Sequence, residues 1–387
     1  MSVVSANGKD CLFYKTVPVN VAFIRATTAD EIGNLSIERE GMALEILSIA
    51  QAAKNHGGIV VAQVERLAKA HSIPARMVKV PHILVDYVVV ADPENHWQTF
   101  AERYNPAVSG EIILPPELVE KKPLDARKII GRRGLFEIHP GSVVNLGIGM
   151  PEAVSFAAAE EGVSDIFTLT VESGIIGGVP LGGVHFGVGV NYDAMIDHPY
   201  QFDFYDGGGL DIAFLGLAQV DKLGNVNVSK FGGRFVGCGG FINIAQNSKT
   251  VVFCGTLTAK NLEEKIEGGK LKIVKEGDTK KFVTKVDHVT FSGEYGKTLG
   301  KRVLYVTERC VFGLSERGII LKEIAPGVNL DRDILGQMDF APLVADDLAT
   351  MDSRIFSYAS MGLKNSLTKL EEDHPRETLT RPSVPST

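Results

Sequence analysis

TLTVESGIIGG, at residues 168–178, places one acidic side chain, Glu172, between an apolar run and a glycine-rich turn. The apolar run predicts a β-strand over Asp165–Val171 that ends at this glutamate. Ligands of α/β proteins bind at the carboxyl ends of strands, and glycines let a bulky ligand approach the backbone closely. A glutamate in this place can also cap a helix or face water. The surrounding glycines favour a functional carboxylate.

Strands and helices are predicted to alternate along the rest of the chain. Before Glu172, the β-branched runs Val19–Arg25 and Gly58–Ala62 flank a segment of helical spacing, Met42–Lys54. The other expected elements are strands over Val85–Ala91 and Ser142–Leu146, a basic amphipathic helix over Ala126–Phe136, a helix over Glu152–Glu161 that begins after Pro151, and an exposed meander over Glu263–Val289. Such alternation indicates an α/β fold.

An internal repeat predicts two related halves. Three short motifs recur at a constant displacement of 191 positions, which is hard to obtain by chance. Asp-x-x-Gly-Asn alone would be ordinary turn chemistry. The matches are Ala22-Phe23-Ile24 with Ala213-Phe214-Leu215, Asp30-x-x-Gly33-Asn34-Leu35 with Asp221-x-x-Gly224-Asn225-Val226, and Val60-Val61 with Val251-Val252.

The two copies differ in what precedes the shared turn. About 95 residues of strand and helix pattern, 126–220, precede it in the second copy, but only 29 residues precede it in the first. The first half is therefore expected to lack its front. The expected organisation is a first half-domain over 1–103, a linker over 104–124, a second half-domain over 125–365, and a tail over 366–387 that is too polar to fold.

The composition excludes several classes of protein. The formal charge of −7 argues against a nucleic-acid partner, and no apolar stretch reaches the length of a membrane span. The opening residues MSVVSANGKD do not resemble a secretory signal. The scattered cysteines, Cys11, Cys238, Cys254 and Cys310, predict reduced thiols of a cytoplasmic protein rather than disulfides or a metal site.

The stretch Glu172-Ser173-Gly174-Ile175-Ile176-Gly177 resembles the glutamate-containing signature of the family I CoA-transferases. Two further segments match that family in order, LGIGMPE at 146–152 and GNVNV at 224–228, the latter followed by GCGGFI at 237–242. The single-chain acetate, propionate and acetoacetate CoA-transferases are the most similar type. The resemblance covers residues 11–365 and implies an α/β fold of two similar open-sheet half-domains, with the first truncated.

The resemblance also implies a reaction and a site. Glu172 would be the catalytic carboxylate that forms a glutamyl–CoA thioester, so that CoA passes in two steps from a short-chain acyl-CoA to a carboxylic acid. These CoA thioesters and acids would be the substrates, with no cofactor and no metal. The glycines implied to contact CoA are Gly147, Gly149, Gly174, Gly237, Gly239 and Gly240.

The loop at Gly147–Gly149 also has other interpretations. It follows a predicted strand and opens a helix, as a dinucleotide-binding loop does, but the third glycine of GxGxxG is absent, so a nicotinamide site is not expected. Its backbone amides could meet part of CoA. A simple tight turn would have the same residues.

The missing front leaves the activity open. Family members carry an early glycine-rich loop that helps to stabilise the thioester oxyanion, and losing one such donor costs about 10²–10³ in rate. Two alternatives therefore remain, an acyl-CoA hydrolase and a non-catalytic subunit that binds CoA or a phosphorylated metabolite. We expect a homo-oligomer, a further chain that supplies the missing N-terminal part, and a role in cytoplasmic short-chain fatty acid and ketone body metabolism, without nucleic acid or membrane partners.

Overall fold

The structure, a computed structural model, describes residues 1–115 and 122–364 and divides the chain into two units. The first unit comprises Met1–Glu111 with Asp197–Pro199, and the second comprises Ile112–Ile196 and the residues from Tyr200 onward. The expected tail over 366–387 lies outside the described residues, as does part of the expected linker. Within the described ranges, the longest apolar helices are too short to cross a bilayer.

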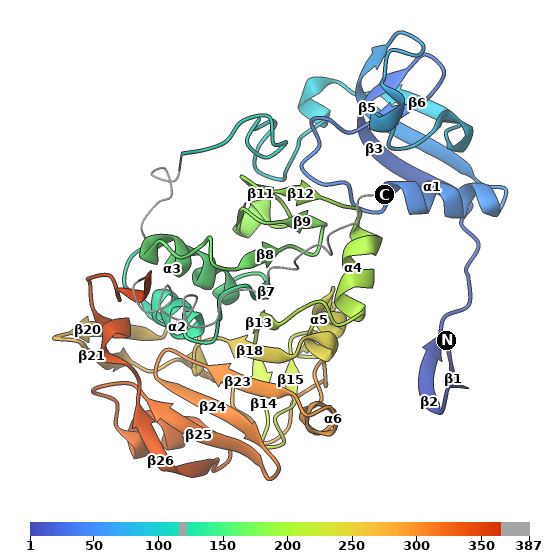
Figure 1. The fold of residues 1–387 in the computed structure, drawn as a ribbon. Coiled ribbons are helices and arrows are strands. Elements are labelled where there is room, and N and C mark those ends of the chain that lie inside the picture. Colours follow the sequence, from blue (N-terminus) through green and yellow to red (C-terminus); the bar gives the residue numbers. More distant parts are fainter. Residues whose placement is uncertain (116–121, 365–387) are drawn as a thin grey trace, which may run out of the picture. The chain divides into compact units, whose positions relative to one another are not determined.

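The first unit is built on a four-stranded sheet in the order β4-β3-β5-β6. Its strands β3 (Val21–Asp30), β5 (Ile59–Ala68) and β6 (Tyr87–Val90) are parallel, while the short β4 (Leu35–Ser36) runs antiparallel to β3. Helix α1 (Ile46–Asn55) packs on one face of this sheet (Figure 1). A separate hairpin joins β1 (Ser2–Ala6) to β2 (Lys9–Phe13).

Two boundaries in the first unit differ from those expected. The helix expected over Met42–Lys54 begins only at Ile46, because Leu44 has a φ of 49°, which an α-helix cannot contain. The strand expected to end at Arg25 continues to Asp30, because its parallel pairing with β5 continues as far as Asp30 and Ala68. Neither cause is visible in hydrophobic spacing.

The second unit is built on a ten-stranded sheet in the order β12-β9-β8-β7-β13-β18-β23-β24-β25-β26 (Figure 1). The five strands from β8 to β23 are parallel neighbours, and their carboxyl ends share one edge. Their bounds are β7 (Val143–Leu146), β8 (Thr168–Thr170), β13 (Ile212–Gly216), β18 (Thr250–Cys254) and β23 (Arg302–Val306), followed by β24 (Cys310–Ser315), β25 (Gly318–Ile324) and β26 (Leu343–Thr350), with β9 (Ile175–Ile176) and β12 (Ala194–Met195) at the other edge.

Helices cover both faces of the parallel strands, as buried parallel sheets require. On one face lie α2 (Ala126–Leu135) and α3 (Ala153–Glu161), whose apolar side chains pack against residues such as Phe214. On the other face lie α4 (His198–Asp206) and α5 (Phe241–Asn247), which pack against residues such as Phe253 (Figure 1).

Smaller elements complete the unit. They include α6 (Gly293–Thr298) and the strand pairs β10 (Val179–Pro180) with β11 (Gly189–Val190), β14 (Gln219–Val220) with β15 (Val226–Asn227), β16 (Lys230–Phe231) with β17 (Arg234–Phe235), β19 (Thr258–Ala259) with β22 (Thr279–Lys280), and β20 (Glu263–Glu267) with β21 (Lys270–Lys275).

The amphipathic character expected for helix α2 is wrong. Instead of forming a solvated basic face, Arg132 is 2% exposed and donates to the carbonyl oxygens of Ile355 and Ala359 at 3.2 and 3.0 Å. Arg133 is also buried and pairs with Glu137 and Glu323. Long cationic side chains are accepted in a core only when they are paired. Apart from Glu137, these partners come from the C-terminal part of the unit, far away in sequence.

The internal repeat is confirmed in atomic detail. Asn34 donates its backbone N–H to Asp30 Oδ1 at 2.8 Å and its side-chain amide to Asp30 Oδ2 at 3.1 Å. Asn225 makes the same two bonds to Asp221, at 3.2 and 3.0 Å. The parallel registers also correspond, since Ala22 pairs with Val60 as Ala213 pairs with Val251. The two halves therefore share one local fold.

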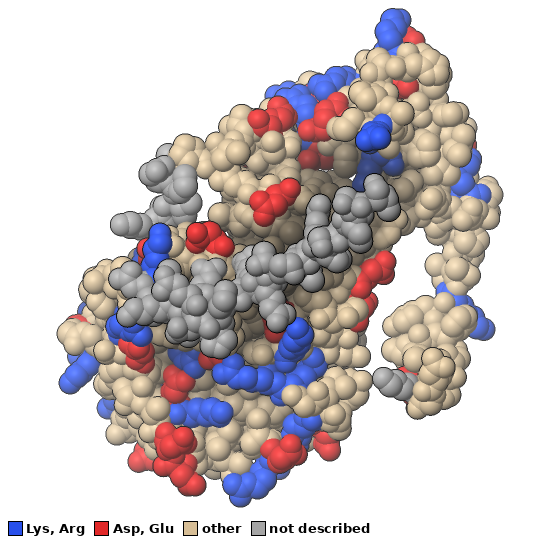
Figure 2. Space-filling model, in the orientation of Figure 1, with Lys and Arg blue, Asp and Glu red and all other residues tan. Residues whose placement is uncertain are grey.

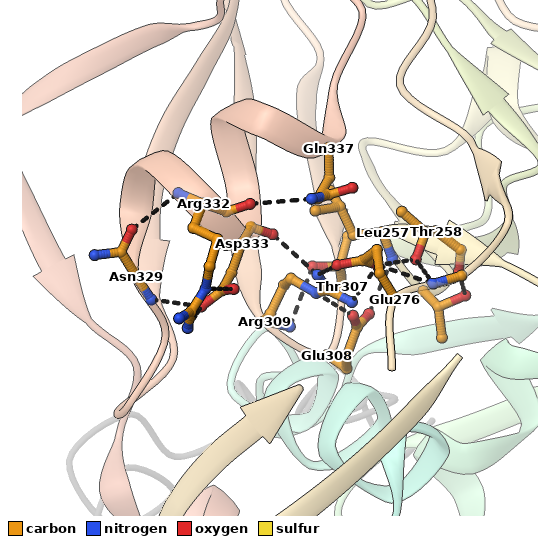
Figure 3. Close-up of polar contacts among 12 residues, drawn as sticks. Leu257, Thr258, Glu276, Thr307, Glu308, Arg309, Asn329, Arg332, Asp333 and Gln337 are labelled. Carbon is orange, nitrogen blue, oxygen red and sulfur yellow. Dashed lines mark hydrogen bonds and ion pairs between the residues drawn. The ribbon is translucent and has the colours of Figure 1, made fainter. Parts of the chain in front are cut away.

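A buried ion cluster fixes the turn between β23 and β24. Arg309 has no exposed side-chain surface and donates to Glu308 at 2.5 Å, to Glu276 at 2.8 Å and to the Asp333 carbonyl oxygen at 2.9 Å (Figure 3). Glu308 in turn accepts the backbone N–H of Leu257 at 2.9 Å. At the surface, by contrast, basic and acidic side chains are interspersed over the face that Figure 2 shows of the second unit.

Candidate active site

Glu172 lies in a tight turn at the carboxyl end of β8, on the edge of the sheet where the neighbouring parallel strands β7 and β13 also end. The turn is closed by the bond from the Gly174 N–H to the Val171 carbonyl oxygen at 3.0 Å. Gly174 has a φ of 111°, and a side chain there would collide with the Ile196 carbonyl oxygen. The predicted glycine turn therefore serves to reverse the chain directly after Glu172.

The residue that ends β8 is held from two sides. Thr170 Oγ1 donates to the Val144 carbonyl oxygen of β7 at 2.9 Å and accepts the Tyr205 hydroxyl of α4 at 2.8 Å. Asn145 donates its side-chain amide to the same Tyr205 oxygen at 3.2 Å. Because Thr170 is two residues before Glu172, these contacts fix the backbone from which the carboxylate projects.

Tyr205 is fully buried and keeps its proton. Burial raises the pKa of its hydroxyl, and the negative charge of nearby Glu172 raises it further, although hydrogen bonds with Thr170, Gln201 and Asn145 act in the opposite direction. The hydroxyl is thus a permanent neutral donor beside the candidate nucleophile. Gln201, which lies one helical turn before Tyr205 on α4, is 0% exposed as well.

Gly240 is the predicted glycine that the structure brings against Glu172. A Cβ at this position would lie less than 3.0 Å from Glu172 Oε2 and from Phe202 Cζ. The backbone itself would accept any residue, because Gly240 has a φ of −77°. Space for the carboxylate, rather than conformation, therefore requires glycine here.

The other glycines of the predicted site take different places. Gly147 follows β7 and donates its N–H to the Phe214 carbonyl oxygen at 2.8 Å, so this position is a close contact between two strands. Gly149, with a φ of 84°, begins the short helix Met150–Glu152 that leads into α3. Gly237 and Gly239 lie in the loop before α5, and a Cβ at either one would meet no described atom within 4 Å. That open space leaves room for a ligand beside the loop.

Glu152, the other acid near these loops, has a local role. Its carboxylate accepts the Gly149 N–H at 2.9 Å, and it lies 3.9 Å from Arg127. A negative side chain at the start of a helix is stabilised by the free backbone amides there. Nothing in this arrangement frees it for attack on a substrate.

Sequence reasoning missed Asn145, Thr170, Phe202 and Tyr205. One signal was available, since Asn145 interrupts the otherwise apolar strand Val143–Leu146 and a buried polar residue normally has a purpose. Phe202 and Tyr205 give no local signal, because α4 approaches Glu172 only through the fold.

Comparisons with known proteins identify the family of this chain. The profile of the family described as Coenzyme A transferase matches residues 2–91 and 135–332. The caffeate CoA-transferase of Acetobacterium woodii is 47% identical over 375 residues, which cover 95% of this chain and 71% of that protein. The acetate CoA-transferase YdiF of Escherichia coli K12 is 46% identical over 362 residues, covering 94% and 68%.

A solved relative has the same fold. The crystal structure of the acyl-CoA transferase YdiF from Escherichia coli O157:H7, as a thioester complex with CoA, superposes with a TM-score of 0.87 at 45% identity and covers 93% of this chain and 68% of that one. These matches extend over most of the chain. The chain therefore belongs to the coenzyme A transferase family, whose members are enzymes.

Proposed function

We propose that this protein transfers CoA from a short-chain acyl-CoA to a carboxylic acid, with Glu172 as the group that carries the intermediate. The observation that supports this most directly is the contact of the Glu172 carboxylate with Gly240, at the edge of the sheet where the strands end. A carboxylate is a weak nucleophile in water, so it must be held at attack distance and shielded from solvent. The two hydrogen bonds of Thr170 and the packing of Phe202 help to hold the carboxylate in position.

The steps balance without any cofactor beyond the CoA thioester. Glu172 attacks the thioester carbonyl, the C–S bond breaks, and an acyl–glutamyl anhydride and CoA thiolate form. The thiolate attacks the glutamyl carbonyl of the anhydride and expels the first acid as its carboxylate. The resulting glutamyl–CoA thioester then reacts with the second acid by the same steps in reverse order. The names of the two relatives, caffeate and acetate CoA-transferase, support carboxylic acids as acceptors.

The test is a covalent adduct on one residue. After incubation with acetyl-CoA, the protein should be heavier by CoA minus water, and borohydride should then reduce Glu172 alone to its alcohol. Mass spectrometry of the peptide Ile166–Gly178 locates the change. Glu172→Gln should abolish the adduct, whereas Glu294→Gln, on the exposed start of α6, should not. A Glu172→Gln variant that still exchanges CoA would rule out the mechanism.

Hydrolysis is tested in the same experiment. Free thiol is followed with acetyl-CoA alone and with propionate added. A transferase releases thiol only slowly in either case, because CoA stays in thioester linkage. Rapid thiol release that does not depend on propionate would assign hydrolysis instead.

We propose further that a polypeptide segment covers the second face of the sheet in the first unit. Phe23 is 79% exposed there, whereas Phe214, its counterpart in the repeat, is 0% exposed beneath α2 and α3. Val21 and Ile59 are likewise exposed on this face, although parallel sheets are normally covered on both sides. A strand–helix segment similar to residues 126–161, from the same or another chain, would fit.

The covering segment can be tested by fusion. Placing the corresponding segment of the longer YdiF relative before Met1 should protect the backbone amides of β3 from hydrogen exchange and raise the transfer rate. Phe23→Asp should cancel both effects. Unchanged exchange in β3 would contradict the proposal. We also propose a homo-oligomer, which light scattering would detect, and a role in short-chain fatty acid and ketone body metabolism. The free cysteines support a cytoplasmic location for this role.

A further inference from the structure

A cavity of about 420 Å³ lies within the first unit, where β3 and β5 meet the loop that follows β6. This volume is in the range of small-molecule sites. Three guanidinium groups, from Arg25, Arg39 and Arg103, line it together with the carboxylates of Glu40 and Glu65. Positive charge is therefore in excess on its wall.

Arg25 is held in place by a buried carboxylate. Its Nε donates to Glu40 Oε2 at 2.9 Å, and its Nη1 donates to the Trp97 carbonyl oxygen. The Glu40 side chain is only 10% exposed, and its other oxygen lies 3.2 Å from His96 Nε2. Two of the three nitrogens of this guanidinium are thus fixed by protein partners, and Nη2 has no hydrogen-bond partner among the residues that the structure describes.

His96 is the second partner of the Glu40 carboxylate. Its Nδ1 lies 3.2 Å from Gln63 Nε2, and the same amide nitrogen donates to the Asn95 carbonyl oxygen at 3.0 Å, which fixes the orientation of the amide. Since Nδ1 then accepts a hydrogen bond, the ring proton belongs on Nε2, facing Glu40. Glu40 therefore has its oxygens occupied by Arg25 and His96.

Arg39 and Arg103 lie on the outer part of the wall. The Arg39 guanidinium stacks on the Tyr104 ring at 3.7 Å from its centroid and donates to Glu65 at 2.5 Å. The backbone of Arg39 is fixed by Gln98, whose amide donates to its carbonyl oxygen at 2.7 Å. Arg103 is exposed, and within the described ranges its guanidinium makes no hydrogen bond or ion pair.

The unused hydrogen-bonding groups of this wall are mainly donors. A guanidinium group has five N–H donors and no acceptor, and the carboxylates nearby already receive bonds from the arginines and His96. A ligand that completes the site must then supply acceptor oxygens. We propose that the cavity binds an oxyanion, a carboxylate or phosphate group, between Arg25, Arg39 and Arg103.

Both oxyanion types occur in the proposed reaction, on the carboxylic acid and on the phosphates of CoA, and planar guanidinium groups bind both. The choice of these two sources rests on the proposed function. The existence of the site does not, since it follows from the cavity wall alone.

Binding can be followed through Trp97, the only tryptophan of the chain, whose carbonyl oxygen accepts the Arg25 bond. The full chain carrying Glu172→Gln, which cannot form the proposed intermediate, is titrated with propionate, inorganic phosphate or CoA at constant ionic strength, with chloride as the reference. A saturable change in Trp97 fluorescence with at least one of them supports the site. A response to propionate only identifies the carboxylic acid as the ligand. A response to phosphate or CoA identifies the phosphate groups of CoA.

Two variants separate the site from general charge attraction. Arg103→Gln should weaken binding about tenfold, as expected for one partly solvated charged hydrogen bond, without loss of folding because its side chain has no partner to lose. Arg76→Gln, an equally exposed arginine outside the cavity, should leave the Kd unchanged. Arg25→Lys keeps the charge but not the paired donors and should also weaken binding.

The result that overturns the proposal is equally direct. No saturable response to any of the three anions would exclude an oxyanion site. An equal loss of affinity in Arg103→Gln and Arg76→Gln would show general electrostatics only. In either case an adduct at Glu172 in the unmodified chain would remain possible, so failure of this site and failure of the proposed reaction are distinguishable.

Discussion

The Tyr205 hydroxyl of α4 donates a hydrogen bond to Thr170 Oγ1 at 2.8 Å, two residues before Glu172. Tyr205→Phe keeps the buried ring and removes this bond, so the carboxylate loses part of its positioning. We expect the rate of glutamyl–CoA formation to fall about tenfold, because small misplacements of a reacting group reduce rates strongly. The KM for acyl-CoA should change little. Rapid quench with mass spectrometry measures both quantities.

The matched control for this prediction is Tyr200→Phe, on the same helix but 61% exposed, which should react at the unmodified rate. Stability should fall by about 1–3 kcal/mol in Tyr205→Phe, because the buried Asn145 amide loses its acceptor as well. If Tyr205→Phe forms the glutamyl–CoA adduct at the unmodified rate, the hydrogen bond between Tyr205 and Thr170 has no part in catalysis.

Gly240→Ala tests the space reserved for the Glu172 carboxylate. The added methyl group would lie less than 3.0 Å from Glu172 Oε2 and from Phe202 Cζ, so the end of the glutamate side chain must move away. Since the backbone at Gly240 tolerates alanine, the fold should persist while adduct formation falls about 10²-fold. Gly336→Ala, which meets only the Asp331 carbonyl oxygen at 3.1 Å, is the control. Equal rates for the two variants would contradict the crowding argument.

Arg309→Met tests the buried ion cluster at the β23–β24 turn. The variant leaves the buried Glu308 and the half-buried Glu276 without their cation, and we expect it to destabilise the second unit by about 3–5 kcal/mol. Adding Glu308→Gln to Arg309→Met should recover part of the loss, because it removes one uncompensated charge. Urea unfolding followed by circular dichroism gives the difference. Arg317→Met, at an exposed position, should leave the free energy of unfolding unchanged. If Arg309→Met also leaves it nearly unchanged, the ion cluster does not stabilise the unit.

Asp86 should make the first unit sensitive to acid. The ion pair with Lys54 at 2.7 Å, and then the bond from the Val60 N–H at 2.8 Å, hold the pKa of this carboxyl below its usual value of 3.8. A lowered pKa means that the stabilisation is present above 3.8 and is lost as the pH falls through the pKa of the folded state. Urea unfolding followed by Trp97 fluorescence should show Asp86→Asn less stable than the unmodified chain at pH 7, with a difference that shrinks as the pH falls below 3.8.

Lys54→Met provides the comparison for Asp86. It removes the ion pair but keeps the Val60 bond, so its loss at pH 7 should be smaller than that of Asp86→Asn. A stability difference between Asp86→Asn and the unmodified chain that stays constant from pH 7 to pH 2 would show that this carboxyl does not contribute to acid unfolding.

Much of the chain follows from local rules. The expected strand and helix over Ser142–Leu146 and Glu152–Glu161 correspond to β7 and α3, because apolar periodicity is a local property. The repeat was recognisable because Asp30 and Asp221 each bond the asparagine four residues later, within one turn. The predicted ends of helices and strands were less accurate where the backbone conformation of one residue sets them. The positive φ of Leu44, for example, delays the start of α1.

Local patterns were enough to predict a glutamate between an apolar strand and a glycine turn, since strand pattern and turn chemistry act over a few neighbouring residues. The surroundings of that glutamate depend instead on long-range packing. Gly240 and Tyr205 come from other parts of the chain, and they reach Glu172 because α4 and α5 cover the same face of the parallel strands. The burial of Arg132 and Arg309 has the same origin, because the carbonyl and carboxylate oxygens that stabilise them lie on separate elements.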